Sequence, residues 1–162
     1  SDDPVLFLEH KNLLALKGPV PEGEYLIPFG RAAVRRTGTD LTIVGIGFTV
    51  KQALDAAEQL AAEGVSAEVI DPRTLAPLDI ATILASVHKT GRLLVVDEDF
   101  APCGVAGDIA AQVMERGFDD LDAPVRRLNG LFAPAPYSPP LYAPVVPSVS
   151  GIVQAAAELL AE

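Results

Sequence analysis

Apolar runs and amphipathic stretches alternate along most of the chain. Residues 40–47, DLTIVGIG, are almost continuously apolar, and similar runs follow at residues 65–71 and 92–98. Strands covered on both faces of a parallel sheet have this appearance. A fourth strand is predicted at residues 123–130, APVRRLNG.

Helical periodicity fills the intervals between these strands. Thr49 and Gln52 have the spacing of a capping box, and Asp79 stands where a helix N-cap is expected. Apolar residues recur at helical spacing over residues 50–61, 80–87, 109–114 and from about 150. Strand–helix alternation predicts an α/β fold with three α/β/α layers, a mostly parallel sheet of about five strands, and one antiparallel strand.

The chain before this regular region has a different pattern. Residues 4–10, PVLFLEH, predict a short buried strand. Residues 11–29 are punctuated by glycines and prolines, which is typical of a linker, so we place the main domain at residues 30–162. Residues 31–36 predict a strand that a turn at 37–39 would pair antiparallel with the next strand.

A proline-rich segment interrupts the pattern near the end of the chain. Residues 132–147 contain six of the fourteen prolines. Such a composition favours an extended, stiff segment. Because it also contains Leu, Val and Tyr, we expect it to dock on the surface of the domain.

The composition narrows the classes of function. A chain of 162 residues with 49% hydrophobic and 21% charged residues is typical of one globular domain. Twenty-two acidic against twelve basic residues give a net charge of −10, which argues against a nucleic-acid partner. No apolar run reaches the roughly 18 residues of a membrane span, so no membrane partner is expected. The single cysteine excludes an internal disulfide and favours a reducing compartment.

Glycines and carboxylates at the strand ends are the first candidates for chemistry. Gly45 and Gly47 begin a dinucleotide-type motif, but Val50 replaces its third glycine, so close backbone packing is the preferred interpretation. Asp97, Glu98 and Asp99 could serve in acid–base or metal chemistry. Since adjacent strand residues point to opposite faces, at most two could converge, and a solvated strand end is expected.

The next turn offers a second candidate. Gly104 and Gly107 lie at a predicted helix start, where they could hold an anion or simply build a tight turn. A thiolate at Cys103 would be favoured there, but no His or Asn lies nearby in sequence, so an inert buried thiol is expected.

The remaining polar candidates are isolated in the sequence. His10 and His88 belong to no metal-ligand spacing, so no metal site is predicted. Arg126 and Arg127 could reach an acidic partner, but strand alternation would expose only one of them.

Taken in order, the segments resemble one family over essentially all 162 residues. The matching stretches include DPVLFLEHK, YLIPFGRAAV, VIDPRTLAPLD, and LDAPVRRLNG followed by PAPYSPP. They are similar to the β subunits of thiamine-diphosphate-dependent 2-oxoacid dehydrogenases (E1 components) of the pyruvate, branched-chain and acetoin types. The EHK sequence at residues 9–11 is more similar to the branched-chain and acetoin types.

The resemblance implies a transketolase C-terminal-like domain of a larger oxidoreductase. Residues 1–10 would be the last strand of a preceding pyrimidine-binding domain. The complete enzyme would decarboxylate a 2-oxoacid on thiamine diphosphate and magnesium, and acylate the lipoyl group of the E2 acyltransferase. Neither the activating glutamate nor the metal motif occurs in these residues, so the isolated chain is expected to bind no cofactor and to be inactive.

The resemblance also implies partners and a location. These are an E1 α subunit, a second β subunit in an assembly of two α and two β subunits, and the E2 acyltransferase, in the cytoplasm or the mitochondrial matrix of a eukaryote. Possible turn or interface residues are Glu98, Cys103, Gly104, Gly107, Arg127 and Phe132.

Two departures and two alternatives accompany this resemblance. Cys103-Gly104 stands where many relatives have two glycines, and Phe132 where an acidic residue is common, which bears on docking. The alternatives are a domain of another thiamine enzyme, of the transketolase or deoxyxylulose-phosphate synthase type, and a freestanding acidic protein-binding module.

Overall fold

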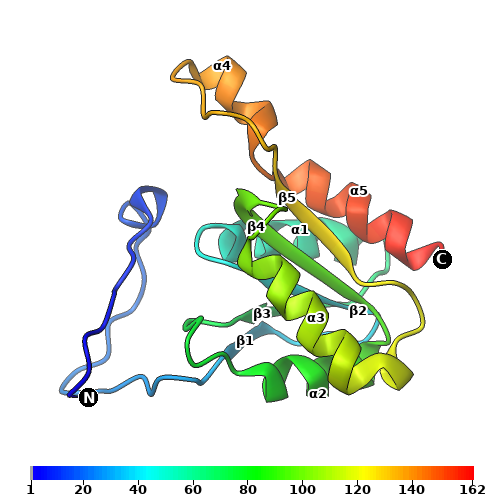
Figure 1. Ribbon diagram of the computed structural model, residues 1–162, viewed down its shortest axis with the longest axis horizontal. Helices are drawn as coiled ribbons and strands as arrows, with labels where there is room; N and C mark the ends of the chain where they lie inside the picture. Colours follow the sequence, from blue (N-terminus) through cyan, green and yellow to red (C-terminus); the bar gives the residue numbers. More distant parts are fainter. Residues whose placement is uncertain (1) are drawn as a thin grey trace.

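A five-stranded sheet forms the centre of the protein, and the computed structural model describes residues 2–162. The strands are β1 (Ala33–Arg36), β2 (Leu41–Gly45), β3 (Ala67–Asp71), β4 (Leu93–Phe100) and β5 (Arg126–Gly130). The main helices are α1 (Thr49–Ala62), α2 (Ile80–Thr90), α3 (Val105–Gly117) and α5 (Val149–Leu160). The short elements are η1 (Lys11–Leu13), η2 (Phe118–Asp120), α4 (Pro139–Tyr142) and η3 (Ala143–Val145). The predicted three-layer, mostly parallel sheet is confirmed (Figure 1).

The sheet has the strand order β1-β3-β2-β4-β5. The four strands β2 to β5 are parallel, and β1 is antiparallel to β3. The prediction that β1 pairs with the strand following it is therefore wrong. The connection crosses the start of β3 at Gly38, where an added Cβ would lie 2.2 Å from the carbonyl carbon of Ala67. Only glycine permits this crossing, which places β1 and β2 on opposite sides of β3.

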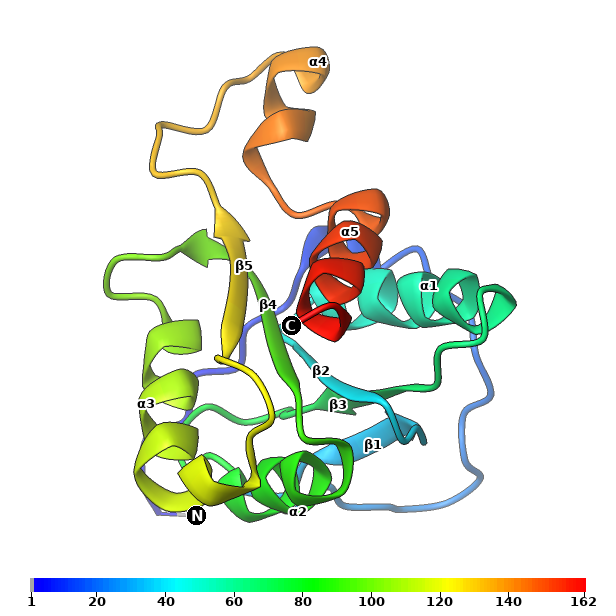
Figure 2. The same ribbon diagram turned by 90° about the vertical axis from the view of Figure 1, so that its right-hand side faces the viewer.

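Two hydrophobic clusters cover the two faces of the sheet. α1 and α5 pack on one face, where Ile43, Leu94 and Val96 are fully buried. α2 and α3 pack on the other face, against Val44 and Val95 (Figure 2). Successive residues of β2 and β4 therefore pack in opposite clusters. Since both faces of these strands are buried, their sequences are apolar throughout instead of alternating.

The helix starts follow the predictions in part. Asp79 caps α2, since its Oδ1 accepts the N–H of Thr82 at 3.2 Å. The predicted capping box at Thr49 is wrong, because the buried Thr49 hydroxyl accepts the N–H of Ile46 at 2.7 Å and contacts the carbonyl of Val96 at 2.8 Å. This hydroxyl ties the turn after β2 to β4 instead of capping α1.

Two segments lie outside the domain body. Residues 4–10 form no strand in this chain and are exposed up to His10, so their assignment to the last strand of a preceding domain stays a prediction. Residues 132–144 project away from the sheet with α4, and Tyr137 is fully exposed (Figure 1). The predicted docking of this segment on its own domain is therefore wrong. The projection is closed at its base, where the N–H of Leu131 donates to the carbonyl of Val145 at 2.8 Å.

Residues Pro139–Leu160 are, by length and composition, the one candidate membrane span among the residues described. The backbone is extended at Val146 and Ser148, which divides the run into a helical turn and the separate helix α5. Ile152, Ala156 and Leu159 of α5 are buried in the hydrophobic core. The apolar character of α5 is thus explained by packing within the domain.

Candidate functional site

The carboxyl edge of the parallel strands is the first place to look for a site. Open α/β sheets bind ligands where the strand order reverses. In this sheet the reversal falls between β2 and β4, since the chain leaves β2 toward β3 and returns on the other side to β4. The turn after β2 and the loop after β4 therefore meet at this edge.

Gly45 and Gly47 shape the turn after β2. An added Cβ at Gly45 would lie 2.7 Å from the backbone nitrogen of Val50, so α1 approaches the strand as closely as the sequence interpretation requires. Gly47 has a φ of +62°, which glycine adopts without strain. Both glycines thus have backbone roles, as predicted.

Asp97 is buried at the end of β4. Its side chain is 5% exposed, so the predicted solvated strand end is wrong for this residue. Its Oδ1 accepts the N–H of Asp99 at 3.2 Å, and its Oδ2 has no hydrogen-bond partner among the described residues. Burial raises the pKa of the Asp97 carboxyl group, and the negative charge of Asp99 adds to that rise.

Asn129 lies beside Asp97 on β5, as its register partner. Its Nδ2 donates to the carbonyl of Asp99 at 3.1 Å, while its buried Oδ1 has no partner in the described chain. Both side chains face α3, because the preceding residues Val96 and Leu128 pack in the opposite cluster. A proton on Oδ2 of Asp97 could be donated to Oδ1 of Asn129, which would satisfy both atoms.

Glu98 is joined to a residue far away in sequence. His10 Nε2 lies 2.9 Å from Glu98 Oε2, and the imidazole ring stacks on Phe48 with centroids 5.2 Å apart. His10 is isolated in the sequence but has two partners in space. No sequence spacing could have revealed the contact, since the three residues belong to three separate segments.

Cys103 and the glycines after it build the turn into α3. Cys103 is exposed with a φ of +61°, so the predicted inert buried thiol is wrong. The turn needs a left-handed residue here, which fits the glycine expected from the resemblance. An added Cβ at Gly104 would lie 2.3 Å from the Phe100 carbonyl oxygen, and one at Gly107 would lie 3.3 Å from Arg127 Nη1. These distances favour the tight-turn interpretation of both glycines.

Arg127 and Phe132 lie at the same edge. Arg127 is exposed and donates through Nη1 to the carbonyl of Ala101 at 3.3 Å. Phe132 is 77% exposed and packs edge-on against Phe100 at a centroid distance of 5.3 Å. Both side chains therefore support the loop after β4 rather than converge on a common centre.

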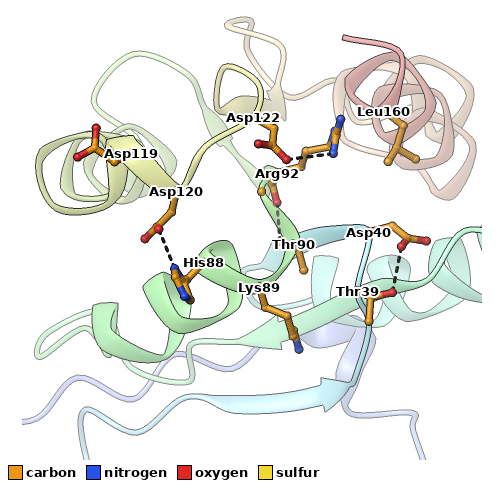
Figure 3. Close-up of a pocket in the computed structure, with 11 residues that line it drawn as sticks. Thr39, Asp40, His88, Lys89, Thr90, Arg92, Asp119, Asp120, Asp122 and Leu160 are labelled. Carbon is orange, nitrogen blue, oxygen red and sulfur yellow. Dashed lines mark hydrogen bonds and ion pairs between the residues drawn. The ribbon is translucent and has the colours of Figure 1, made fainter.

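A polar cleft of about 540 Å³ lies at the opposite, amino edge of the strands (Figure 3). Its wall includes four aspartates, Asp40, Asp119, Asp120 and Asp122. His88 Nδ1 lies 2.7 Å from Asp120 Oδ1, and this hydrogen bond, with the carboxylate charge, raises the pKa of His88. Sequence reasoning missed the cleft because several separate segments contribute to it.

An apolar hollow of about 490 Å³ adjoins the polar cleft and shares Asp122 with it. Met114 and Phe118 line the hollow and are 43% and 63% exposed. The amino edge thus presents an apolar surface directly beside a cluster of carboxylates.

The described residues do not fit thiamine diphosphate with magnesium. Within residues 2–162, no three His, Cys, Asp or Glu side chains are grouped so as to hold a metal ion. The carboxyl edge carries the carboxylates of Glu98 and Asp99, which would repel a diphosphate.

The chain is similar to β subunits of known dehydrogenases. It is 46% identical over 161 residues to the acetoin:2,6-dichlorophenolindophenol oxidoreductase subunit beta of Bacillus subtilis, covering 99% of this chain and 47% of the relative. The Cupriavidus necator protein of the same name is 50% identical over 155 residues, covering 96% and 46%. The mitochondrial pyruvate dehydrogenase E1 component subunit beta-1 of Arabidopsis thaliana is 46% identical over 157 residues, covering 94% and 43%. The chain thus spans about half the length of these relatives.

Structural similarity and family assignment agree with the fold. A split-gene transketolase, described as an inactive beta4 tetramer, matches with a TM-score of 0.72 and 28% identity, covering 83% of this chain and 44% of that one. Residues 30–152 match the family described as transketolase, C-terminal domain. Because this match covers most of the chain and the five-stranded sheet agrees with it, the chain belongs to the transketolase C-terminal domain family.

Proposed function

We propose that this chain is the C-terminal domain of the β subunit of a 2-oxoacid dehydrogenase E1 component of the pyruvate, branched-chain or acetoin type. The observation that carries the proposal is 46% identity over 94% of the chain to a pyruvate dehydrogenase E1 component subunit beta, beside 50% identity to the acetoin oxidoreductase subunit beta. The enzyme would perform the oxidative decarboxylation of its substrate and transfer the acyl group to lipoyl-E2. It would act in the cytoplasm, or in the mitochondrial matrix of a eukaryote.

Within that enzyme the domain serves assembly rather than chemistry. The described residues include buried Asp97 but no grouping suited to the cofactor or its metal. Thiamine diphosphate and magnesium would be held by the rest of the β subunit and by the α subunit. The exposed apolar side chains of residues 4–29 and 131–142 supply surface for the α subunit and a second β subunit.

Calorimetric titration tests this division of labour. The 162-residue chain, titrated with thiamine diphosphate and magnesium, should show no saturable binding. The assembled enzyme of α and β subunits should bind the cofactor under the same conditions. Tight binding by the isolated chain would contradict the proposal.

The polar cleft at the amino edge, where four aspartates outnumber Lys89 and Arg92, supports docking of the E2 acyltransferase. Four aspartates surround it, and the adjoining hollow offers Met114 and Phe118 as apolar contacts. A partner segment combining basic and apolar side chains would complement both surfaces. Phe132 lies at the opposite edge of the sheet, so the absence of an acid there leaves this surface unchanged.

The docking surface can be tested separately from the family assignment. Replacing Asp119 and Asp120 with Asn should weaken binding of the E2 component by about tenfold and reduce its salt dependence. The control replaces exposed Glu22 and Glu24 with Gln, which makes the same change in net charge on the linker. Equal binding by both variants would exclude the cleft as the docking site without affecting the rest of the proposal.

A further inference from the structure

The His10 side chain attaches the N-terminal segment to the sheet. Among the described residues 2–29, His10 and Leu13 are half-buried and the others are exposed. The His10 side chain is 30% exposed, and Glu98 beside it is 23% exposed. The segment is therefore largely exposed and is held close to the sheet at His10.

His10 is held by three contacts. Its Nε2 lies 2.9 Å from Glu98 Oε2, and its Nδ1 accepts the N–H of Asn12 at 3.2 Å. The ring stacks on Phe48 with an interplanar angle of 11°. Since Nδ1 is an acceptor, the proton of the neutral ring must lie on Nε2, where it is donated to the carboxylate.

The surface that receives His10 is firmly built. The Thr49 hydroxyl fixes the turn that carries Phe48 to the carbonyl of Val96 on β4. The backbone of Glu98 packs against β5, where an added Cβ at Gly130 would lie 2.3 Å from the Glu98 carbonyl oxygen. Phe48 and Glu98 thus lie on firmly anchored backbone at the edge where the strand order reverses.

A second attachment fixes the other end of the linker. The N–H of Gly30 donates to Thr74 Oγ1 and that of Ala32 to Asp79 Oδ2, both at 2.9 Å. Thr74 and Asp79 belong to the loop that follows β3. Residues 11–29 therefore form a loop tied at both ends to the carboxyl edge of the sheet.

We propose that His10 is a positioning residue, whose insertion between Phe48 and Glu98 locks the segment preceding the linker onto the carboxyl edge of this domain. The edge at which other open sheets bind ligands carries the protein's own imidazole here. The interaction surface is an apolar ring paired with a carboxylate, and its partner is the N-terminal segment itself. This inference concerns contacts within the chain and does not depend on the substrate of the enzyme.

The two histidines of the chain allow a spectroscopic test. Long-range ¹H–¹⁵N spectra of the 162-residue chain above the histidine pKa range should show His10 as the Nε2–H tautomer. The Glu98→Ala variant should move the two ring ¹⁵N shifts closer together, toward the fast-exchange average of a free imidazole, in which the Nε2–H form still predominates. His88, which contacts Asp120 through Nδ1, should be unchanged in that variant and serves as the internal reference.

Limited trypsin digestion measures the attachment itself. Cleavage after Lys11 requires the short helix η1 to detach, so its rate reports the fraction of detached segment. His10→Ala and Glu98→Ala should each accelerate this cleavage by about tenfold. The double variant should be cleaved no faster than the faster single variant, because the pair acts as one unit.

Controls separate the pair from general effects on the segment. Glu9→Gln removes one charge from an exposed neighbour of His10 and should leave the cleavage rate unchanged. Phe48→Leu removes the stacked ring and should give a smaller acceleration. The proposal is overturned if Glu98→Ala changes neither the ring ¹⁵N shifts of His10 nor the cleavage rate after Lys11, or if the two single effects multiply in the double variant.

Discussion

Asp97 and Asn129 bring two unsatisfied acceptor atoms into the protein interior. Each side chain has one hydrogen bond, yet Oδ2 of Asp97 and Oδ1 of Asn129 have no donor within residues 2–162. A buried acceptor without a donor costs about 1–3 kcal/mol. The fold tolerates this arrangement at the carboxyl edge, and the raised pKa of Asp97 indicates that the ionised form is the unfavourable one.

Asp97→Asn should stabilise the domain at neutral pH. The amide keeps an oxygen for the Asp99 N–H and offers its NH₂ group to the lone acceptor of Asn129, a gain of about 1 kcal/mol. Because the folded-state pKa of Asp97 is raised, its contribution to stability is complete below the unfolded pKa and is lost as pH rises through the folded pKa. The gain from the substitution should therefore be present at pH 7 and shrink toward about pH 3.

Urea denaturation at the two pH values measures this difference. Glu24→Gln, at an exposed position, is the matched control and should have little effect at either pH. A loss of stability in Asp97→Asn at pH 7 would mean that the native protein needs the ionised carboxylate.

At the residue scale, the sequence predicted backbone roles better than exposure. The close approach at Gly45 follows from a glycine at the junction of strand and helix. The burial of Asp97 and the exposure of Cys103 were both predicted wrongly. Burial at the end of β4 depends on how α3 crosses the strand, and that crossing angle has no local sequence signal.

At the scale of elements, buried polar contacts fasten α2 to the sheet. The hydroxyl of Thr42 on β2 lies 2.6 Å from that of Ser86 and 2.7 Å from that of Thr90 on α2. Glu68 of β3, only 3% exposed, pairs with Lys89 of the same helix. The position of α2 is thus set by hydrogen bonds at its C-terminal half as well as by apolar packing.

Lys89→Gln should destabilise the domain by about 2 kcal/mol at pH 7, because it leaves the Glu68 carboxylate buried without its charged partner. Burial alone would raise the pKa of Glu68, but hydrogen bonds from Lys89, Ser86 and the Gly38 N–H outweigh it and lower the pKa. The contribution of Glu68 is therefore present above its unfolded pKa and is lost as pH falls through the folded pKa.

The destabilisation by Lys89→Gln should accordingly fade in acid, as measured by thermal or urea unfolding. Lys51→Gln is the control, since Lys51 pairs with Asp55 one helical turn away and both side chains are 40% exposed. Such a surface pair contributes about 0.5 kcal/mol or less. If the two lysine variants lose stability equally, Glu68 does not depend on Lys89.

The positions of the helices and strands along the chain were largely predictable, but which elements lie next to each other was not. Apolar runs and helical periodicity located β2, β3, β4 and the helices α1, α2, α3 and α5. The position of β1 was missed because a turn of three residues favours a hairpin, whereas Gly38 lets the chain cross β3. The predicted capping box failed because the buried Thr49 hydroxyl bonds to the neighbouring strand β4 instead of capping its own helix.

At the scale of the whole molecule, much apolar surface lies outside the two core clusters. Leu6, Phe7 and Leu8 are 92%, 83% and 85% exposed, and Phe132 and Tyr137 continue this character at the projecting segment. The domain body could be predicted because its apolar residues find partners within the chain. The course of the outlying segments could not, because most of their large apolar side chains stay exposed and give no local signal of where the segments lie.

The apolar N-terminal segment should make the 162-residue chain self-associate. Sedimentation should give an average mass that rises with concentration above the monomer mass of 17.0 kDa. Replacing Phe7 and Leu8 with Ser should weaken association by at least about tenfold, since each buried large side chain contributes about 1.5–3 kcal/mol. Leu75→Ser, on the domain body at 45% exposure, is the control. A wild-type chain that stays monomeric throughout would contradict this expectation.

The closed base of the projection has a consequence for protein engineering. Because Leu131 and Val145 are joined by a hydrogen bond, a segment inserted between them should not shift the end of β5 or the start of α5. Doubling such a loop costs only about 0.6 kcal/mol. The projection is therefore a natural position for grafting a foreign peptide onto this domain.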